Sequence, residues 1–318
     1  MASYCVVGSL NMDMVTRVPR FLVPGETLTG LSFGIFPGGK GANQAVALAR
    51  LGARVEMVGA IGDDVLGARY ASILETEGVG RTMLRVRRGT STGTASIEVA
   101  DSGENHIAIV PGANASVDTS FIEEARPLIE SSDVVLLQLE IPLDSVVLAA
   151  SIARAAGRTV ILDPAPAREL PPELYPLLSY ITPNETEASI LTGEECADEA
   201  SILRAARILL EKGTGAVIVK AGKRGAYIAD AHGCISVQGF AVDAIDTVAA
   251  GDSFNAGLAF ALADARGKDL CSEVRFANAV AALSTTKEGA QAAMPGLDDV
   301  RRFLAALGVT IDITSFLV

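Results

Sequence analysis

The sequence predicts an α/β fold with a mainly parallel sheet covered by helices on both faces. Five apolar segments rich in valine, isoleucine and leucine have the character of buried strands: YCVVGSL, VEMVGAIG, DVVLLQLE, TVILDPAPA and GAVIVKAG. Amphipathic helical segments alternate with strands along the chain: GANQAVALARLGA, DVLGARYASILETEG, SVVLAASIARAAG and ASILRAARILLEKG. This alternation is typical of a parallel sheet buried on both faces. The 318 residues show no linker, so we expect a single domain over 1–318.

Two segments break this alternation and predict a small antiparallel sheet. Residues 11–37 hold no helical period and alternate threonine with apolar residues. The segment STGTASIEVADSGENHIAIVPGAN, which begins at residue 91, has the pattern of two strands around the turn DSGEN. We expect 11–37 and about 91–111 to form a lid over the carboxyl ends of the parallel strands, where α/β proteins bind ligands. The alternative is an edge extension. The final GVTIDITSFLV also alternates like a strand.

Composition and charge argue against several functions. The formal net charge of −12 and the pI near 4.7 argue against a nucleic-acid partner, which requires a basic face. The four cysteines and two histidines are scattered, so we expect no zinc-type site and interpret the cysteines as small buried residues in a reducing compartment. The sequence shows neither a signal peptide nor an apolar run of membrane-spanning length. We therefore expect a cytoplasmic protein without a membrane partner.

The glycine-rich GIFPGGKG has the outline of a P-loop but lacks its chemistry. Gly41 stands where a P-loop has the serine or threonine whose hydroxyl binds magnesium, and no buried strand precedes the segment. The sequence also lacks the pattern of a dinucleotide-binding site, because no GxGxxG opens a helix after a strand. The segment PGGKGANQA instead offers exposed backbone amides at a helix start, and the simplest alternative is a glycine-rich helix cap.

Polar side chains at the ends of the predicted strands point to a polyol site. Asn11 and Asp13 follow the first strand, and alternation places both on the same side. Lys40 and Asn43 lie at the start of the following helix, and Glu140 closes the strand DVVLLQLE. Carboxylate, carboxamide and ammonium groups that converge on one cleft suit a polyol, whose hydroxyls need matched donors and acceptors.

The segment DTVAAGDSFNAG combines an expected anion site with a carboxylate. Its small residues precede a helix and let several amides point at one spot, where the helix end adds roughly half a positive charge. Asp252 at this helix start is a candidate base for an attacking hydroxyl, and a plain N-cap is the alternative. Phosphoryl transfer needs this pairing of a positioned nucleophile and a stabilised phosphate charge.

Together these strings resemble the ribokinases of the PfkB-type carbohydrate kinase family. The resemblance runs over nearly the whole chain, through VVGSLNMD, PGGKGANQA, STGTASI, QLEIPL, DPAPAREL, TPNETEA, DTVAAGDSFNAG and KEGAQ. It implies a ribokinase-like three-layer α/β/α core with a β-lid, often shared between the two subunits of a homodimer. It also implies ATP-dependent phosphorylation of D-ribose at the 5-hydroxyl, giving ribose 5-phosphate and ADP.

The resemblance assigns roles to individual residues. Asp252 is the expected base, with an anion hole formed by the amides around Ala249, Ala250 and Gly251. The sugar would be held by Asn11, Asp13, Gly39, Lys40, Asn43 and Glu140. The nucleotide would be held by Asn184, Glu187, Lys220, Gly222, Gly225 and Asn278, with Mg²⁺ bound largely through phosphates and water. A monovalent cation, expected to be K⁺, would be held by Asp246, Val248, Ser284, Lys287, Gly289 and Ala293.

Three positions depart from the family pattern, and three alternatives stay open. Lys220 stands where threonine is common, Asp163 where asparagine is frequent, and Ala293 lacks a hydroxyl often found near the cation. Asn184 and Glu187 could form a helix-capping box instead of, or as well as, organising the magnesium–phosphate end of ATP. The substrate could be 2-deoxyribose or another pentose. A catalytically silent sugar-binding regulator is the third alternative, against which the intact Asp252 string argues.

Overall fold

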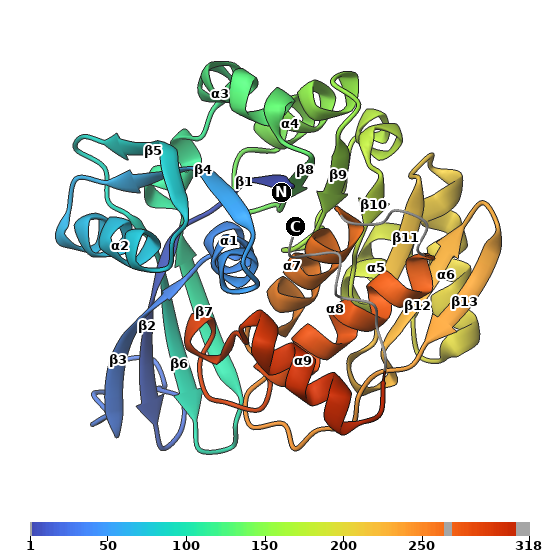
Figure 1. Cartoon of the computed structure of the whole chain (residues 1–318). Coiled ribbons are helices and arrows are strands. Elements are labelled where there is room, and N and C mark those ends of the chain that lie inside the picture. Colours follow the sequence, from blue (N-terminus) through green and yellow to red (C-terminus); the bar gives the residue numbers. More distant parts are fainter. Residues whose placement is uncertain (1, 264–268, 310–318) are drawn as a thin grey trace.

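The computed structural model describes residues 2–263 and 269–309, and its centre is a mostly parallel sheet (Figure 1). Within these residues nine strands are ordered β13-β12-β11-β10-β9-β8-β1-β4-β5. From β11 to β5 in this order, every neighbouring pair is parallel. The pairs β11–β12 and β12–β13 are antiparallel. The strands are β1 Ser3–Val7, β4 Arg54–Gly62, β5 Gly80–Arg87, β8 Val134–Leu137, β9 Thr159–Leu162, β10 Tyr180–Ile181, β11 Ala216–Lys220, β12 Ala226–Asp230 and β13 Gly233–Val237.

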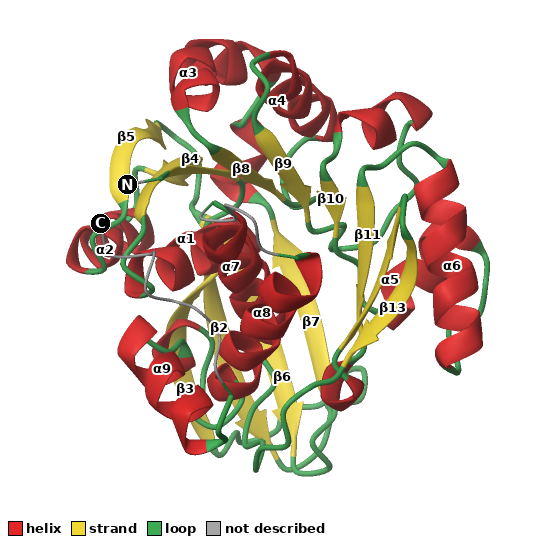
Figure 2. Ribbon diagram, turned by 45° about the vertical axis from the view of Figure 1, so that its right-hand side comes forward, coloured by secondary structure: helices red, strands yellow, loops and turns green. Residues whose placement is uncertain are grey.

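Helices cover both faces of this sheet, as Figures 1 and 2 show. One layer contains α3 Thr119–Ser131, α4 Leu143–Ala155, α5 Glu185–Thr192 and α6 Glu199–Glu211. The other contains α1 Lys40–Arg50, α2 Val65–Thr76, α7 Ala250–Leu262, α8 Leu270–Ser284 and α9 Leu297–Ala306. Short 3₁₀ turns occur at Gly112–Ser116, Pro172–Leu177, Gly222–Arg224 and Gln291–Ala293.

The apolar strands are buried on both sides because alternate residues enter different cores. On β1, Cys5 and Val7 pack into the core under α3 and α4, while Tyr4 and Val6 pack into the core under α1 and α7. This two-sided burial explains why the strand sequences are continuously apolar. The predicted α/β fold class is confirmed, and the five predicted strands correspond to β1, β4, β8, β9 and β11.

A second sheet of four strands forms the lid and lies at the lower left in Figure 1. Its order is β3-β2-β6-β7, formed by β2 Asn11–Val18, β3 Ser32–Gly38, β6 Gly93–Ala100 and β7 Asn105–Val110. The lid is mixed rather than antiparallel throughout, because β2 and β6 pair in parallel. The strand β2 follows β1, and β6 follows β5, which runs parallel to β1 through β4. Both hairpins therefore leave the same edge of the main sheet in the same direction.

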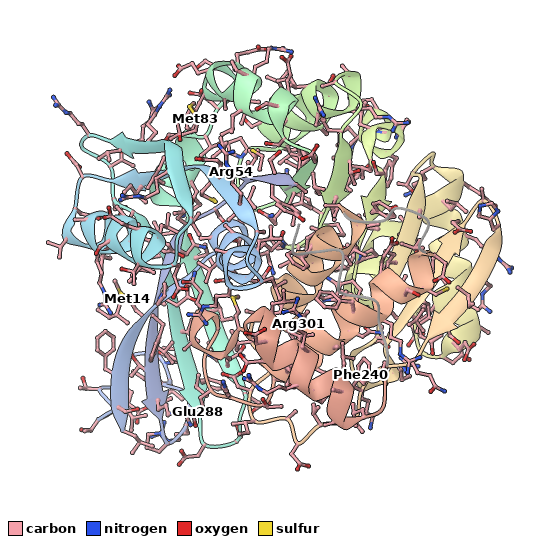
Figure 3. All side chains as sticks on the ribbon, viewed as in Figure 1. Met14, Arg54, Met83, Phe240, Glu288 and Arg301 are labelled. Atoms are coloured by element: carbon pink, nitrogen blue, oxygen red, sulfur yellow. The ribbon has the colours of Figure 1, made fainter. Side chains whose placement is uncertain are left out.

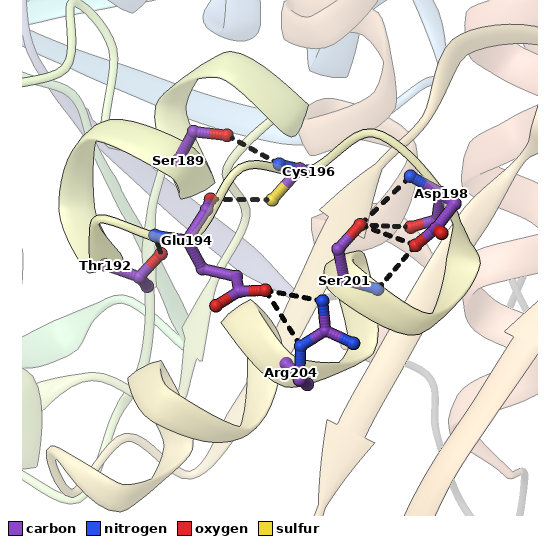
Figure 4. A network of polar contacts seen from close by, with 7 residues as sticks. All are labelled: Ser189, Thr192, Glu194, Cys196, Asp198, Ser201 and Arg204. Carbon is purple, nitrogen blue, oxygen red and sulfur yellow. Dashed lines mark hydrogen bonds and ion pairs between the residues drawn. The ribbon is translucent and has the colours of Figure 1, made fainter.

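Local capping fixes the connection between α5 and α6 (Figure 4). The Asp198 side chain accepts from the Ser201 amide at 2.8 Å, which caps α6, and the Cys196 amide donates to Ser189 Oγ at 3.0 Å. The four cysteines are free, and two of them are only half-buried, in contrast to the expectation that all would be buried. No helix among the described residues is long and apolar enough to span a membrane. The strand expected at GVTIDITSFLV lies outside the described residues from 310 onward.

Candidate active site

The α7 N-terminus presents the buried carboxylate of Asp252, which is 4% exposed. Asn43 Nδ2 donates to one carboxylate oxygen at 2.9 Å, and Gln44 Nε2 donates to the other at 3.2 Å. Burial raises the pKa of Asp252 to about 6, with Lys40 lowering it and Asp163 raising it. The result is a carboxylate fixed in orientation and poised to accept a proton near neutral pH.

Unpaired backbone amides lie beside this carboxylate. Ala249 caps α7 with φ 59° and ψ 14°, and it is the one non-glycine residue with positive φ in the described ranges. The Ala250 amide donates to Thr247 O at 3.2 Å. Within the described chain, the amides of Ala249, Gly251 and Asp252 have no backbone acceptor. These amides lie at the positive end of the helix dipole, where an anion could bind, whereas the Ala250 amide is engaged in the turn.

Asn11 is held by a residue that the sequence did not single out. Its side-chain oxygen accepts from Asn114 Nδ2 at 2.7 Å. Asn114, which is itself buried, also accepts from the Leu10 amide at 2.9 Å and donates to Leu10 O at 3.1 Å. The Asn11 amide group is thus oriented with its nitrogen directed away from Asn114, available as a donor.

Asp13 lies two residues further along β2, so its side chain lies on the same side of the strand as that of Asn11. Gly38, which pairs with Asn11 across the lid strands, must lack a side chain, because a Cβ there would lie 2.1 Å from Asp13 Oδ2. In the described part of the chain the Asp13 carboxylate accepts no hydrogen bond from protein. Burial, followed by repulsion from Glu140 and Asp252, raises its pKa to about 7. Asp13 is therefore an unsatisfied acceptor facing the site.

Glu140 and Lys40 join the strand end to helix α1. Glu140 Oε2 accepts from the Lys40 amide at 3.0 Å and from the Ser9 hydroxyl. Gly39 precedes the helix with φ 87°, a conformation that favours glycine. The Lys40 side chain enters the same interior, where burial would lower its pKa. The surrounding carboxylates outweigh burial and raise the pKa of Lys40 above its usual range: Asp252, Asp163, Glu140 and Glu187.

A cavity of about 880 Å³ extends from Lys40 and Asp252 along the sheet edge. It is lined by all six residues predicted for the nucleotide: Asn184, Glu187, Lys220, Gly222, Gly225 and Asn278. Its outer wall includes Phe240, labelled in Figure 3, which packs edge-to-face on Phe303 at 5.4 Å between ring centroids. The cavity thus leads from an apolar outer wall to the Asp252 carboxylate.

Two of the predicted nucleotide residues also perform the structural role that the sequence left open. Asn184 caps α5 by accepting from the Glu187 amide at 2.8 Å, and Glu187 accepts from the Asn184 amide at 2.7 Å. The capping box and the position at the cavity wall therefore hold together. Burial raises the pKa of Glu187, and Lys220 opposes this rise. At the far wall, Asn278 Nδ2 donates to Val237 O and Gln238 O, each at 3.3 Å.

Three glutamines link these groups behind the site. Gln138 Nε2 donates to Gln44 Oε1 at 2.7 Å, and Gln291 Nε2 donates to Asn43 Oδ1 at 3.1 Å. Gln44 and Gln291 lie inside the quoted strings PGGKGANQA and KEGAQ, which was the available signal for them. Both are polar residues in buried surroundings, and each holds a site residue in place by a hydrogen bond: Gln44 to Asp252 and Gln291 to Asn43.

Asp246 joins two segments of the expected cation site. Its carboxylate accepts from the Val248 amide at 3.0 Å and the Gly289 amide at 2.9 Å, which joins two loops. Over the described residues no hydrogen bond joins Asp246 to the other expected positions, Ser284, Lys287 and Ala293. Ser284 and Ala293 are buried, and Lys287 is exposed.

Comparison with known proteins shows the family to which this chain belongs. The model of the family described as pfkB family carbohydrate kinase matches residues 1–297. The ribokinase of Haemophilus influenzae is 45% identical over 299 residues, which cover 94% of this chain and 97% of that protein. The chain belongs to the PfkB family of carbohydrate kinases.

Solved structures of PfkB kinases share the whole fold. The ribokinase of Thermotoga maritima is 38% identical, with a TM-score of 0.88, and the match covers 96% of this chain and 100% of that chain. The Arabidopsis thaliana ribokinase complexed with ribose and ATP is 33% identical, with a TM-score of 0.90, and the match covers 96% of this chain and 99% of that chain.

Among sequence relatives, the deoxyribokinase of Salmonella typhi is 35% identical over 301 residues, which cover 94% of this chain and 98% of that protein.

Proposed function

We propose that this PfkB kinase transfers the γ-phosphoryl group of ATP to the 5-hydroxyl of D-ribose. The observation that carries this proposal is the buried Asp252 carboxylate, with its pKa raised to about 6, beside the unpaired amides of the α7 start. Full-length similarity to ribokinases supports ribose as the sugar. A sugar hydroxyl facing Asp252 and a phosphate on the amides would stand in line for transfer.

In the proposed reaction the protein positions both partners and moves one proton. Asn11, Asp13 and Asn43 hold hydroxyls of the sugar, and Asp252 accepts the proton of the 5-hydroxyl. The bond between O5 and the γ-phosphorus forms while the bond from that phosphorus to the bridging oxygen breaks, so that ADP leaves. The amides of Gly251 and Asp252 stabilise charge on the phosphoryl oxygens.

The donor set fits the two cations that the family implies. No group of three acidic, histidine or cysteine side chains in the described residues could hold a metal, which is compatible with Mg²⁺ held mainly by phosphates and water near Glu187. When bound, Mg²⁺ neutralises charge on the β- and γ-phosphates. The oxygens around Asp246 suit a monovalent cation, which would shape the loop before α7.

The test is the release of ADP with ribose and with 2-deoxyribose in parallel, with magnesium and potassium present. We expect a strong preference for ribose, because Asn11 and Asp13 offer polar groups for a hydroxyl-rich ring. An equal or reversed preference would transfer the proposal to 2-deoxyribose, the sugar named for the Salmonella typhi relative. Sugar binding without ADP release would refute the kinase and leave a silent regulator.

We also propose that the lid pairs with the lid of a second copy. Large apolar side chains of its two edge strands are 48 to 62% exposed: Phe33, Phe36, Ile107, Ile109 and Val110. All six residues of β7 are exposed, which is unusual for an apolar edge strand without a partner. A second copy of the same sheet would cover this surface.

Sedimentation of the Ile107→Lys/Ile109→Lys variant tests this pairing. Both residues lie on one face of β7, because they are two positions apart. We expect a dimer for the unchanged protein and for the control Ile190→Lys, whose residue is 58% exposed on α5. The double variant should be monomeric. A monomer in all cases, or a dimer that survives in the double variant, would refute the pairing.

A further inference from the structure

Lys220 and Asp163, the two departures from the family pattern on the nucleotide side, form an ion pair with each other. Lys220 Nζ lies 2.9 Å from Asp163 Oδ1. Their side chains are 12% and 2% exposed, and both line the cavity of about 880 Å³. The pair is therefore shielded from bulk water on most sides, and the ammonium has a fixed place at the cavity wall instead of extending into solvent.

The ammonium is placed above the anion site of α7. A Cβ atom on Gly251 would lie 3.3 Å from Lys220 Nζ. Gly251 supplies one of the unpaired amides at the α7 start, so a phosphate oxygen at this point would meet amide donors and a lysine cation together. A compact ammonium with three donors can bind Asp163 and a phosphate oxygen at once.

We propose that Lys220 binds the phosphoryl group that is transferred, and that Asp163 positions Lys220 for this contact. The proposal rests on the kinase reaction proposed above and adds a basic side chain to an anion site otherwise built from amides. Negative charge is spread over the phosphoryl oxygens in the transition state, so a fixed cation at this point stabilises it.

Asp163 is suited to its positioning role because a second bond holds it. Its other carboxylate oxygen accepts from Gln44 Nε2 at 3.1 Å, and the same nitrogen donates to Asp252 Oδ1 at 3.2 Å. A chain of contacts thus runs from Lys220 through Asp163 and Gln44 to Asp252. The same set of side chains therefore fixes both the lysine that would bind the phosphate and the carboxylate of the proposed base.

Binding measurements on Lys220→Met test the phosphate contact without turnover. The probes are ADP and the β,γ-imido analogue of ATP, each with Mg²⁺, titrated by calorimetry. We expect affinity for the ATP analogue to fall about 10-fold or more and affinity for ADP to change less than about 3-fold, because a bond to a charged group is lost only at the γ-position. The kcat should fall about 10²-fold.

The matched control is Lys212→Met, whose residue bonds Leu191 O and lies outside the cavity lining. It should leave both affinities unchanged. Equal losses for ADP and the ATP analogue in Lys220→Met, or no loss for either, would overturn the proposal. These binding ratios need no sugar, so they are distinct from a failure to phosphorylate ribose.

The positioning role of Asp163 is tested by a double-mutant cycle with Lys220→Thr. Asp163→Asn alone turns an amide towards the ammonium, and we expect it to weaken binding of the ATP analogue about 3-fold or more. In Asp163→Asn/Lys220→Thr the loss should be no larger than in Lys220→Thr alone, because there is no longer a lysine to position. Losses that simply add would show that Asp163 acts independently and would overturn this part.

Discussion

Replacement of Asp13 by asparagine should stabilise the ligand-free protein. The Asp13 carboxylate is half-buried, faces Glu140 and Asp252, and has its pKa raised from 3.8 to about 7. A shift of about three units corresponds to about 4 kcal/mol of unfavourable free energy for the ionised form at pH 8. Asparagine has nearly the same shape and carries no charge, so it removes this cost.

The direction with pH follows from proton binding. Folded Asp13 binds its proton more tightly than unfolded Asp13, so wild-type stability falls as pH rises from about 4 to about 7 and is level above. The advantage of Asp13→Asn should therefore be about 2 kcal/mol at pH 5 and about 4 kcal/mol at pH 8. With an unfolding entropy of about 2.1 cal/mol/K per residue over 318 residues, this gives a Tm increase of about 6 °C at pH 8.

Calorimetric melting at pH 5, 6.5 and 8, without sugar or nucleotide, measures this difference. The control is Asp101→Asn, because Asp101 is an exposed aspartate at the turn of the lid, and its Tm should equal that of the wild type. The reasoning is refuted if Asp13→Asn melts at or below the wild-type temperature at pH 8, or if its advantage does not grow with pH. Its KM for ribose should rise about 10-fold or more, since a charged acceptor is lost.

Four other outcomes follow from the site. Asp252→Asn should lower kcat by about 10² to 10⁴ while calorimetry finds ribose affinity within about 3-fold, and normal turnover would exclude Asp252 as the base. The kcat/KM of the wild type should fall about tenfold per pH unit below about 6, where Asp252 becomes protonated; a flat profile down to pH 5 would contradict this. Asn114→Ala should raise the KM for ribose and cost about 1 to 3 kcal/mol in denaturant unfolding, since Leu10 and Asn11 lose their partner; an unchanged KM would separate Asn11 from the sugar. Exchange of K⁺ for a large organic cation should lower activity, and full activity would remove the cation from Asp246.

Local patterns predicted the centre of the fold better than its edges. The strands β1, β4, β8, β9 and β11 are mainly apolar, with polar residues chiefly near their ends, because they are buried on both faces, and this is visible in sequence. The edge strand β5 carries three arginines among its eight residues and gave no such signal. Parallel pairing of β2 with β6 depends on where the two hairpins leave the main sheet, which no local pattern records.

Candidate site residues were predicted where they share a short string, and contacts between residues far apart in the sequence were not predicted. Asp252 and its helix start were visible because neighbouring small residues and a carboxylate stand together. The bond between Gln44 and Asp163 joins residues 119 positions apart, and that between Gln291 and Asn43 spans 248 positions. Lys220 and Asp163 were each recognised as departures, but only the three-dimensional arrangement showed that they are partners.

Two parallel hairpins connect the lid to the main sheet, so the lid is attached at two neighbouring points. Asn11 and Asp13 belong to β2 of the lid, while Asn43 and Asp252 belong to helices packed on the main sheet. A sugar held by all four residues would connect the lid to the helices that pack on the main sheet. A sugar bound between the two groups of residues would therefore restrict the position of the lid relative to the main sheet.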